Sequence, residues 1–324
     1  MQTYVGDIIQ NARYDTRNAD DIPTSTNAVG IETKDFLRYA NYAQQRLQGR
    51  ISKVYPVMFE AQQEISIVAG TAAYSINDNV YLGTRIRKVE YSWSGNAADY
   101  YPLPPSSPYN TYNSSGRPCV YHRRDGYIVL EPIPSQSTGT IRVTYERTLD
   151  RLDVRRGRIN GTPSGAVIDL THSSYGAPST ADEALFTAGT YVCVCDHYGN
   201  PLLYNGVISS YNSSTDALTL AANVSTYLPS GGTLAGLDNG YITLGKYTTT
   251  HSKLSDEAER YLTEYTTRRI FKRESSDDSV GIDAELEPIE QELINSYKIA
   301  DKDVKEIPIV DHTFFRIGYG WGYD

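Results

Sequence analysis

The chain has few of the features that mark secreted, membrane-spanning or disulfide-rich proteins. Its 324 residues include three cysteines, an odd number that argues against a disulfide framework and fits a reducing compartment. No stretch approaches the roughly 20 apolar residues of a membrane-spanning helix. The first residues lack the basic and apolar segments of a secretory signal. We therefore expect a cytosolic product with no membrane partner and a length that suits roughly one to three domains.

Positive charge is also scarce. Against 39 Asp and Glu there are 30 Lys and Arg, which gives a net charge of -9. Affinity for a phosphate backbone comes from Lys and Arg that displace counterions. The balance argues against tight nucleic-acid binding as the main task, although it permits a wall along which DNA slides without being held.

Phe, Trp and Met are rare, at 6, 2 and 2 residues, whereas there are 28 Tyr. A tyrosine ring packs well while its hydroxyl tolerates water, so tyrosine suits partly buried surfaces, including the centres of protein–protein interfaces. Half-exposed β-strands favour the same residue. The tyrosine content therefore indicates an interaction protein, a β-rich fold, or both.

Known catalytic motifs are missing. There is no metalloprotease His pair, no nucleophile elbow and no glycine-rich phosphate loop after a strand. The histidines are His122, His172, His197, His251 and His312. Cys193, Cys195 and His197 are potential zinc ligands, but alternate side chains of a strand stand nearly 7 Å apart and diverge. Core packing of the two thiols is the favoured interpretation, and we expect no enzyme, no metal and no cofactor.

Charged runs have equally plain interpretations. The acidic pairs Asp277/Asp278 and Glu285/Glu287 fit a loop and exposed helix positions. The basic set Arg155, Arg156 and Arg158 is either a partner-facing patch or an ordinary surface.

Residues 1–63 are expected to be mainly helical. Apolar residues at helical spacing predict a short helix within residues 1–18, and residues 19–32 have loop composition. Thr33 is a plausible N-cap for a longer helix that runs to about Tyr55, because Pro56 would disturb it. A further turn or two would reach Gln63. The predicted buried face of this helix is Phe36, Ala40, Ala43, Leu47 and Ile51.

Residues 64–159 alternate between apolar and polar positions and predict an antiparallel β domain. Strands are expected at 64–67, 85–93, 127–130 and 140–147. In the last of these, Ile141, Val143 and Tyr145 would face one way. Pro, Ser and Gly residues between the last two strands suggest a hairpin connection.

Residues 160–250 are expected to form a second β unit. Five strands, separated by Gly, Asn and Ser clusters, suggest an inserted small barrel or sandwich. They are expected at 166–170, 191–195, 204–211, 217–221 and 241–247.

Residues 251–306 predict two closing helices. The first starts near Ser255, with acidic residues at its start and basic ones at its end, as the helix dipole prefers. The second carries a near-heptad stripe that needs another helix to cover it, and Pro288 would mark its true start. We expect Leu286, Ile289, Leu293 and Tyr297 to form a helix face between subunits.

The last segment, residues 307–324, spaces aromatic residues with glycine and is too sparse to build a core. It is expected to be an extended arm that docks on another surface, with its own domain as the alternative. The aromatic residues of this expected partner-binding arm are Phe314, Phe315, Tyr319, Trp321 and Tyr323. Together the patterns predict an α+β fold, with a helical bundle made by both ends of the chain.

Four sequence segments within residues 35–152 occur in an order and spacing that resemble the head-to-tail adaptors of tailed phages, including the tail tubular protein A group. An amphipathic helix ends in the Gln/Glu-rich segment 59–64. A strand, a glycine turn and a tyrosine follow at 67–76. A Gly-Arg-Pro segment at 116–121 precedes the strand at 126–134, and Ile141 to Arg147 leads into Leu149 and Leu152. Residues 160–247 depart from this pattern.

The resemblance implies a structural virion protein of the phage neck, assembled in the cytoplasm of the bacterial host. Copies, usually about twelve, would form a ring beneath the portal protein, and double-stranded DNA would pass through it without specific binding. The arm would reach the portal, a downstream tail or nozzle protein would bind below, and tail fibres are a further partner. A carbohydrate- or receptor-binding module in residues 160–247 is the alternative, and an unrecognised hydrolase ranks third.

Overall fold

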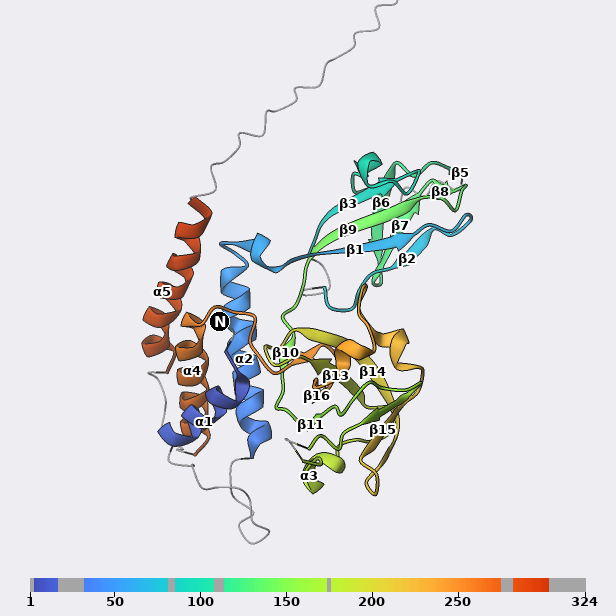
Figure 1. The fold of residues 1–324 in the computed structure, drawn as a ribbon. Helices are drawn as coiled ribbons and strands as arrows, with labels where there is room; N and C mark the ends of the chain where they lie inside the picture. The colour runs from blue at the N-terminus through green and yellow to red at the C-terminus, as the bar shows by residue number, and fades with distance from the viewer. Residues whose placement is uncertain are drawn as a thin grey trace, which may run out of the picture.

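The computed structural model describes residues 3–16, 32–80, 85–107, 114–173, 176–274 and 282–302 (Figure 1). It mixes helices with mainly antiparallel sheets, which confirms the α+β class. Figure 1 shows three parts: a helical body on one side and two β units, one above the other, on its opposite side. The arm residues Phe314, Phe315, Tyr319, Trp321 and Tyr323 lie outside the described residues.

The helical body is built around α2 (Thr33–Ile51). Its predicted apolar face is buried, from Phe36 to Ile51. Glu32 occupies the cap position, so Thr33 is the first helical residue and not the N-cap. The helix ends at Ile51, and a short 3-10 helix, η1 (Pro56–Phe59), follows.

The predicted helical extension to Gln63 is wrong. Strand β1 (Glu60–Ser66) begins before that position, and its backbone pairs with β9 from Glu60 onward. Exposed and half-buried residues alternate along β1. Sheet pairing therefore decides the conformation of a segment whose Gln and Glu residues alone would favour a helix.

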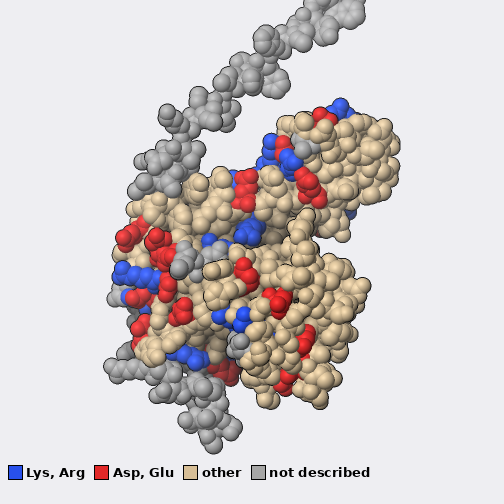
Figure 2. Space-filling model, viewed as in Figure 1, with Lys and Arg blue, Asp and Glu red and all other residues tan. Residues whose placement is uncertain are grey.

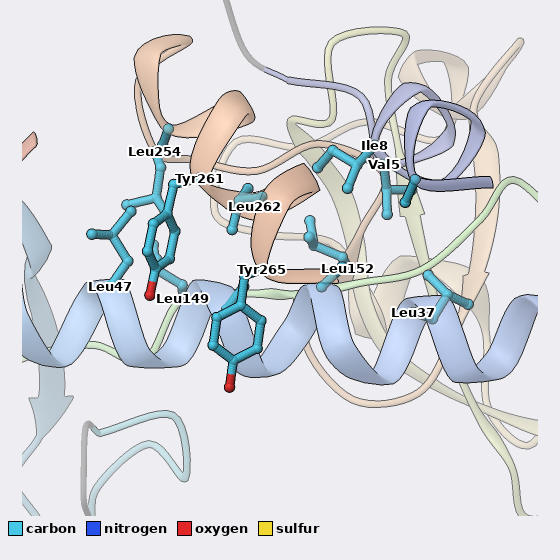
Figure 3. Close-up of a cluster of buried hydrophobic side chains, with 14 of the residues drawn as sticks. Val5, Ile8, Leu37, Leu47, Leu149, Leu152, Leu254, Tyr261, Leu262 and Tyr265 are labelled. Atoms are coloured by element: carbon cyan, nitrogen blue, oxygen red, sulfur yellow. The ribbon is translucent and has the colours of Figure 1, made fainter. Parts of the chain in front are cut away.

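Three more helices cover α2: α1 (Val5–Asp15), α4 (Glu257–Glu274) and α5 (Ile282–Lys302). One apolar core joins all four, with Leu149 and Leu152 from the linker at 147–152. Figure 3 shows the part of this core that comes from α1, α2, α4 and the linker. Pro288 lies inside α5, so its predicted role as the helix start is wrong. Pro288 is the seventh residue of α5 and removes the one helical hydrogen bond that its nitrogen would donate to Ala284, but Leu286 before it packs in the shared core and holds the earlier start.

The first β unit, in the upper part of Figure 1, packs two antiparallel sheets over one core. The larger sheet has the order β1-β9-β3-β4, and the smaller has β2-β7-β6. Their remaining strands are β2 (Ala73–Ser75), β3 (Ile86–Ser92), β4 (Tyr101–Pro102), β6 (Val120–Arg124), β7 (Tyr127–Glu131) and β9 (Thr140–Glu146). A parallel pair, β5 (Ser115–Gly116) with β8 (Ile133–Pro134), and a 3-10 helix, η3 (Ala97–Asp99), complete the unit.

The predicted hairpin between the third and fourth strands is wrong. β7 pairs with β6 across a tight turn at Asp125 and Gly126, whereas β9 lies in the other sheet between β1 and β3. The proline-containing connection carries the chain from the small sheet to the large one, so β7 and β9 do not pair with each other. The predicted shared face of β9 is confirmed, since Ile141, Val143 and Tyr145 all lie in the core of this unit.

The second β unit, in the lower part of Figure 1, has a six-stranded sheet in the order β11-β16-β13-β14-β15-β12. A hydrogen bond from the Asn160 amide to the Asp169 carbonyl, 2.9 Å, links the two ends of the sheet. All five predicted strands are present. The bounds are β11 (Gly157–Arg158), β12 (Val167–Asp169), β13 (Tyr191–Cys195), β14 (Pro201–Asn212), β15 (Ala217–Leu220) and β16 (Tyr241–Leu244), with α3 (Thr180–Glu183), η4 (Val224–Tyr227) and η5 (Ala235–Leu237).

The chain enters and leaves this second unit at neighbouring points. β10 (Arg151–Leu152) runs on the way in and β17 (Thr248–Thr249) on the way out, and the two pair in parallel. The unit is therefore attached to the helical body through a two-stranded neck.

Candidate functional site

The predicted face of α5 packs on its own chain. Leu286 and Leu293 are buried in the core of the helical body, and Ile289 and Tyr297 are partly buried against it. The hydroxyl oxygens of Tyr297 and Ser255 lie 3.0 Å apart. A contact between copies through this face could use only the exposed parts of the Ile289 and Tyr297 side chains. That contact stays a prediction.

A buried carboxylate clamps α5 to α2. Glu290 is 3% exposed, and its carboxylate accepts an ion pair from Arg46 at 3.0 Å and from Arg50 at 3.1 Å. Burial and the nearby Glu290 charge both raise the pKa of the Tyr261 hydroxyl, which lies in the same core. Removing one partner of a buried pair leaves an uncompensated charge, so these contacts fix where α5 lies.

A second set of polar contacts ties α2 to the linker at 147–152. Asn41, Gln44 and Gln48 lie on one side of the helix and are buried. Asn41 accepts from the Leu152 amide at 2.8 Å, Gln44 donates to the Asp150 carbonyl at 2.8 Å, and Gln48 donates to the Arg147 carbonyl at 2.8 Å. These side chains form hydrogen bonds with backbone groups of the linker, as a neighbouring strand would. They therefore position both β units on the helical body.

The outer face of the helical body is hollowed and acidic. A hollow of about 500 Å³ between α1 and α4 is lined by Asp15, Asp256 and Glu259, among others. A groove of about 330 Å³ between α4 and α5 shares Asp256 and Arg260 with it, and is also lined by Ile289 and Glu292. Burial, Asp7 and Asp256 raise the pKa of Glu259. Figure 2 shows charged side chains crowded over the helical side and few on the outer part of the two β units.

The basic set Arg155, Arg156 and Arg158 makes contacts within the chain. Arg156 forms ion pairs with Asp153 at 2.7 Å and Asp182 at 2.8 Å. The Arg155 guanidinium lies over the rings of Tyr4 and Tyr241, 4.3 and 4.1 Å from their centroids. These contacts explain the arginines as part of the junction between the neck and the second β unit.

Cys193 and Cys195 are buried, as the core-packing interpretation predicts. Their thiols contact Asn205 and Thr250, on the side of β13 opposite Val192 and Val194. Burial raises the pKa of both thiols, which opposes the thiolate form that binds metal. Within the described parts of the chain, no three potential ligands form a metal-binding group.

None of the helices in the described ranges combines the length and apolar character needed to cross a bilayer.

Similarity to a known protein family covers most of the chain. A family model described as SU10 adaptor protein matches residues 3–228. That range includes α1, α2, the whole first β unit and most of the second. No curated protein matches the chain.

Proposed function

The chain belongs to the SU10 adaptor protein family, and from that premise we propose that it forms a ring of identical subunits in the neck of a phage virion. The family makes it a structural adaptor of a bacteriophage that interacts with other head and tail proteins. In the proposal the ring has about twelve copies, lies beneath the portal protein, and surrounds the channel through which DNA passes. The family match over residues 3–228 is the observation that carries the proposal.

The acidic outer face of the helices supports a channel wall that does not hold DNA. Asp15, Asp256, Glu259 and Glu292 line neighbouring hollows there, and the chain as a whole carries a charge of -9. Phosphates are repelled by such a surface, so DNA would slide past it. A protein that gripped the genome would need the opposite charge.

The helical body supports a role as the rigid part of the subunit, with α1 and α2 held against α4 and α5 in one core. Contacts between copies would use the outer helix surfaces, including the exposed parts of Ile289 and Tyr297. The arm with Phe314, Phe315, Tyr319, Trp321 and Tyr323 would bind the portal protein, and a tail protein would bind the opposite side. The role is assembly and not catalysis, and the family does not favour the sugar-binding alternative.

Electron microscopy and native mass spectrometry of the purified protein, alone and with the portal protein of the same phage, test this function. A closed ring of about twelve subunits that binds the portal is expected. Deleting residues 307–324 should leave the ring intact and weaken portal binding, with Asp324→Asn as the control that keeps the aromatic residues. A protein that stays monomeric under both conditions, or a truncated ring that binds the portal normally, would contradict the proposal.

A further inference from the structure

A pocket lies on the outer face of the small sheet β2-β7-β6, opposite the face that packs in the core of the first β unit. Its volume is about 470 Å³, within the range of ligand and peptide pockets. Val129 of β7 lies at its centre, with Ala73 of β2 paired on one side and His122 of β6 on the other. Two neighbouring alanines, Ala72 and Ala73, leave the space above the sheet open.

The pocket contains an acceptor that the described chain does not use. Glu131 is 4% exposed and His122 is 7% exposed, and the His122 Nδ1 lies 3.4 Å from the Glu131 Oε1. The other carboxylate oxygen, Oε2, is buried and has no hydrogen-bond partner among the described residues. A buried acceptor without a donor is costly, so a donor from outside the described residues is expected there.

Apart from the exposed pair Arg124 and Asp125, the other walls of the pocket are mainly apolar. Ala73, Val129 and Ile133 line it, and Tyr127 at its rim is 46% exposed. A small polar ligand would leave the apolar side chains exposed to water. A purely apolar ligand would leave the Glu131 carboxylate without a hydrogen-bond donor. The complementary occupant combines an apolar side chain with a cation, spaced to match Val129 and Glu131, which lie two residues apart on β7.

The chain itself contains such a sequence in its C-terminal segment. In Phe314-Phe315-Arg316-Ile317, Phe314 and Arg316 are two residues apart and would share one face of an extended strand. That spacing of nearly 7 Å equals the spacing of Val129 and Glu131 on β7. The C-terminal end of α5 and the small sheet lie toward the same end of the molecule in Figure 1. The residues after Lys302 provide a reach of roughly 40 Å before Phe314.

We propose that the pocket on the β2-β7-β6 sheet binds the segment Phe314–Ile317, with Phe314 against Val129 and the Arg316 guanidinium donating to Glu131. Arginine suits this place because its planar donors match a carboxylate. The assignment revises the proposed function in one respect: Phe314–Ile317 docks on the adaptor, and only Tyr319, Trp321 and Tyr323 are left to bind the portal protein. It needs neither a ring nor a portal, so it is tested on the isolated full-length protein.

The test replaces Phe314 with the photoreactive analogue p-benzoylphenylalanine and maps cross-links by mass spectrometry. Cross-links to residues 72–73 or 127–133 are expected. Arg316→Gln and Glu131→Gln should each lower the yield at these sites by about tenfold, because each removes one partner of a buried charged contact. Mixing isotopically labelled and unlabelled copies shows whether the segment comes from the same or a neighbouring copy, and either result supports the proposal.

Glu60→Gln is the matched control, because it makes the same change on an exposed strand of the other sheet of this unit and should leave the yield unchanged. Arg316→Gln changes no residue of the pocket, so its effect cannot arise from misfolding of the sheet. Cross-links confined to the helical body, or yields that Arg316→Gln does not alter, would overturn the assignment. Ring formation and portal binding are measured separately, so a failure here is distinct from a failure of the proposed function.

Discussion

The helical body and the second β unit build their hydrophobic cores from differently distributed parts of the sequence. The core of the helical body collects residues from four distant stretches, 5–12, 36–59, 149–152 and 254–293. The core of the second β unit comes from one continuous stretch, 159–242, and its apolar members are mostly aliphatic. The first core exists only when both ends of the chain meet, whereas the second needs only its own segment.

Buried polar contacts follow the same division. In the helical body, Glu290 is paired with two arginines and Gln44 and Gln48 hold the linker. The interior of the second β unit rests mainly on Val, Ile and Leu. Directional contacts lose energy with small displacements, while aliphatic packing tolerates exchange of similar volumes. We expect the helical body to depend on particular residues and the second unit on bulk packing.

The largest test of this contrast removes one large side chain from the helical core. Phe36 is fully buried there, and Phe36→Ala is expected to cost about 3–5 kcal/mol. Because the core joins both ends of the chain, hydrogen exchange should rise together in α1, α2 and α4. Strands β13–β15 should keep their protection.

The reciprocal change, Ile168→Ala in the second unit, should cost about 2–5 kcal/mol and loosen that unit first. Denaturant titration gives the two energies, and exchange maps their spread. If Phe36→Ala exposed β13–β15 to the same degree as α2, the two cores would form a single cooperative unit and the contrast would be wrong.

The next test concerns the charged clamp. Glu290→Gln keeps the size of the side chain and removes the charge that Arg46 and Arg50 bind. We expect a loss of about 2–4 kcal/mol, below the upper range for buried pairs because both arginines are partly exposed. The loss should appear as faster amide exchange in α5, measured by mass spectrometry.

Glu287→Gln is the control for this clamp, since Glu287 is exposed on the same helix. It should change stability by no more than about 0.5 kcal/mol. Equal effects of the two substitutions would show that the ion pairs do not hold α5.

Local patterns explain what the sequence predicts well. The strand at 191–195 and the stripe from Phe36 to Ile51 follow from alternation and helical spacing within one segment, and both are present. The helix toward Gln63 fails because the sheet partner of that segment, β9, lies far away in the sequence, where no local signal reports it. The hairpin before β9 fails because β9 pairs with the distant strands β1 and β3, while β7 turns back on β6 through Asp125 and Gly126, which is a local hairpin signal. The start of α5 before Pro288 has the same cause, since contacts with α2 and α4 hold it.

Site prediction shows the same limit. The stripe on α5 indicates that a helix covers it, but not that the covering helices belong to the same chain. Gln44, Gln48 and Glu290 look like surface residues in the sequence, and only the fold reveals them as buried. The proximity of His122 and Glu131 could be predicted from one feature. If β6 and β7 are recognised as a hairpin, both residues occupy outward positions on neighbouring strands.

A smaller effect is expected from the polar contacts of α2. Gln48 donates to the Arg147 carbonyl and accepts from the Leu149 amide. Gln48→Met keeps the volume and leaves both backbone groups buried without partners, at a cost of about 1–3 kcal/mol. Exposed Gln45 on the same helix provides the control, Gln45→Met. Exchange at residues 147–152 is the measurement, and an unchanged rate there would remove the linker role of Gln48.

The effect that is smallest at neutral pH is a pH dependence at the contact between the two regions. His251 follows β17, its ring faces Tyr4 of the N-terminal segment with centroids 5.2 Å apart, and its Nδ1 lies 2.9 Å from the Thr250 hydroxyl. Burial first, and then the nearby Arg155, His197 and Lys253, lower the pKa of His251 to about 4, while Asp196 acts in the opposite direction.

As the pH falls from about 6.5 to about 4, the unfolded chain binds a proton at His251 that the folded chain does not bind, so stability decreases across this window and this group contributes nothing further below it. At pH 5 we expect a loss of about 2 kcal/mol relative to His251→Gln, which lacks the titrating ring. Urea titrations of both proteins at several pH values give the difference curve, with His172→Gln as the control on the second β unit. Parallel curves for the wild-type and His251→Gln proteins would mean that protonation of His251 does not weaken the contact between the two regions. The attachment of the second β unit to the helical body would then depend on the neck and the linker alone.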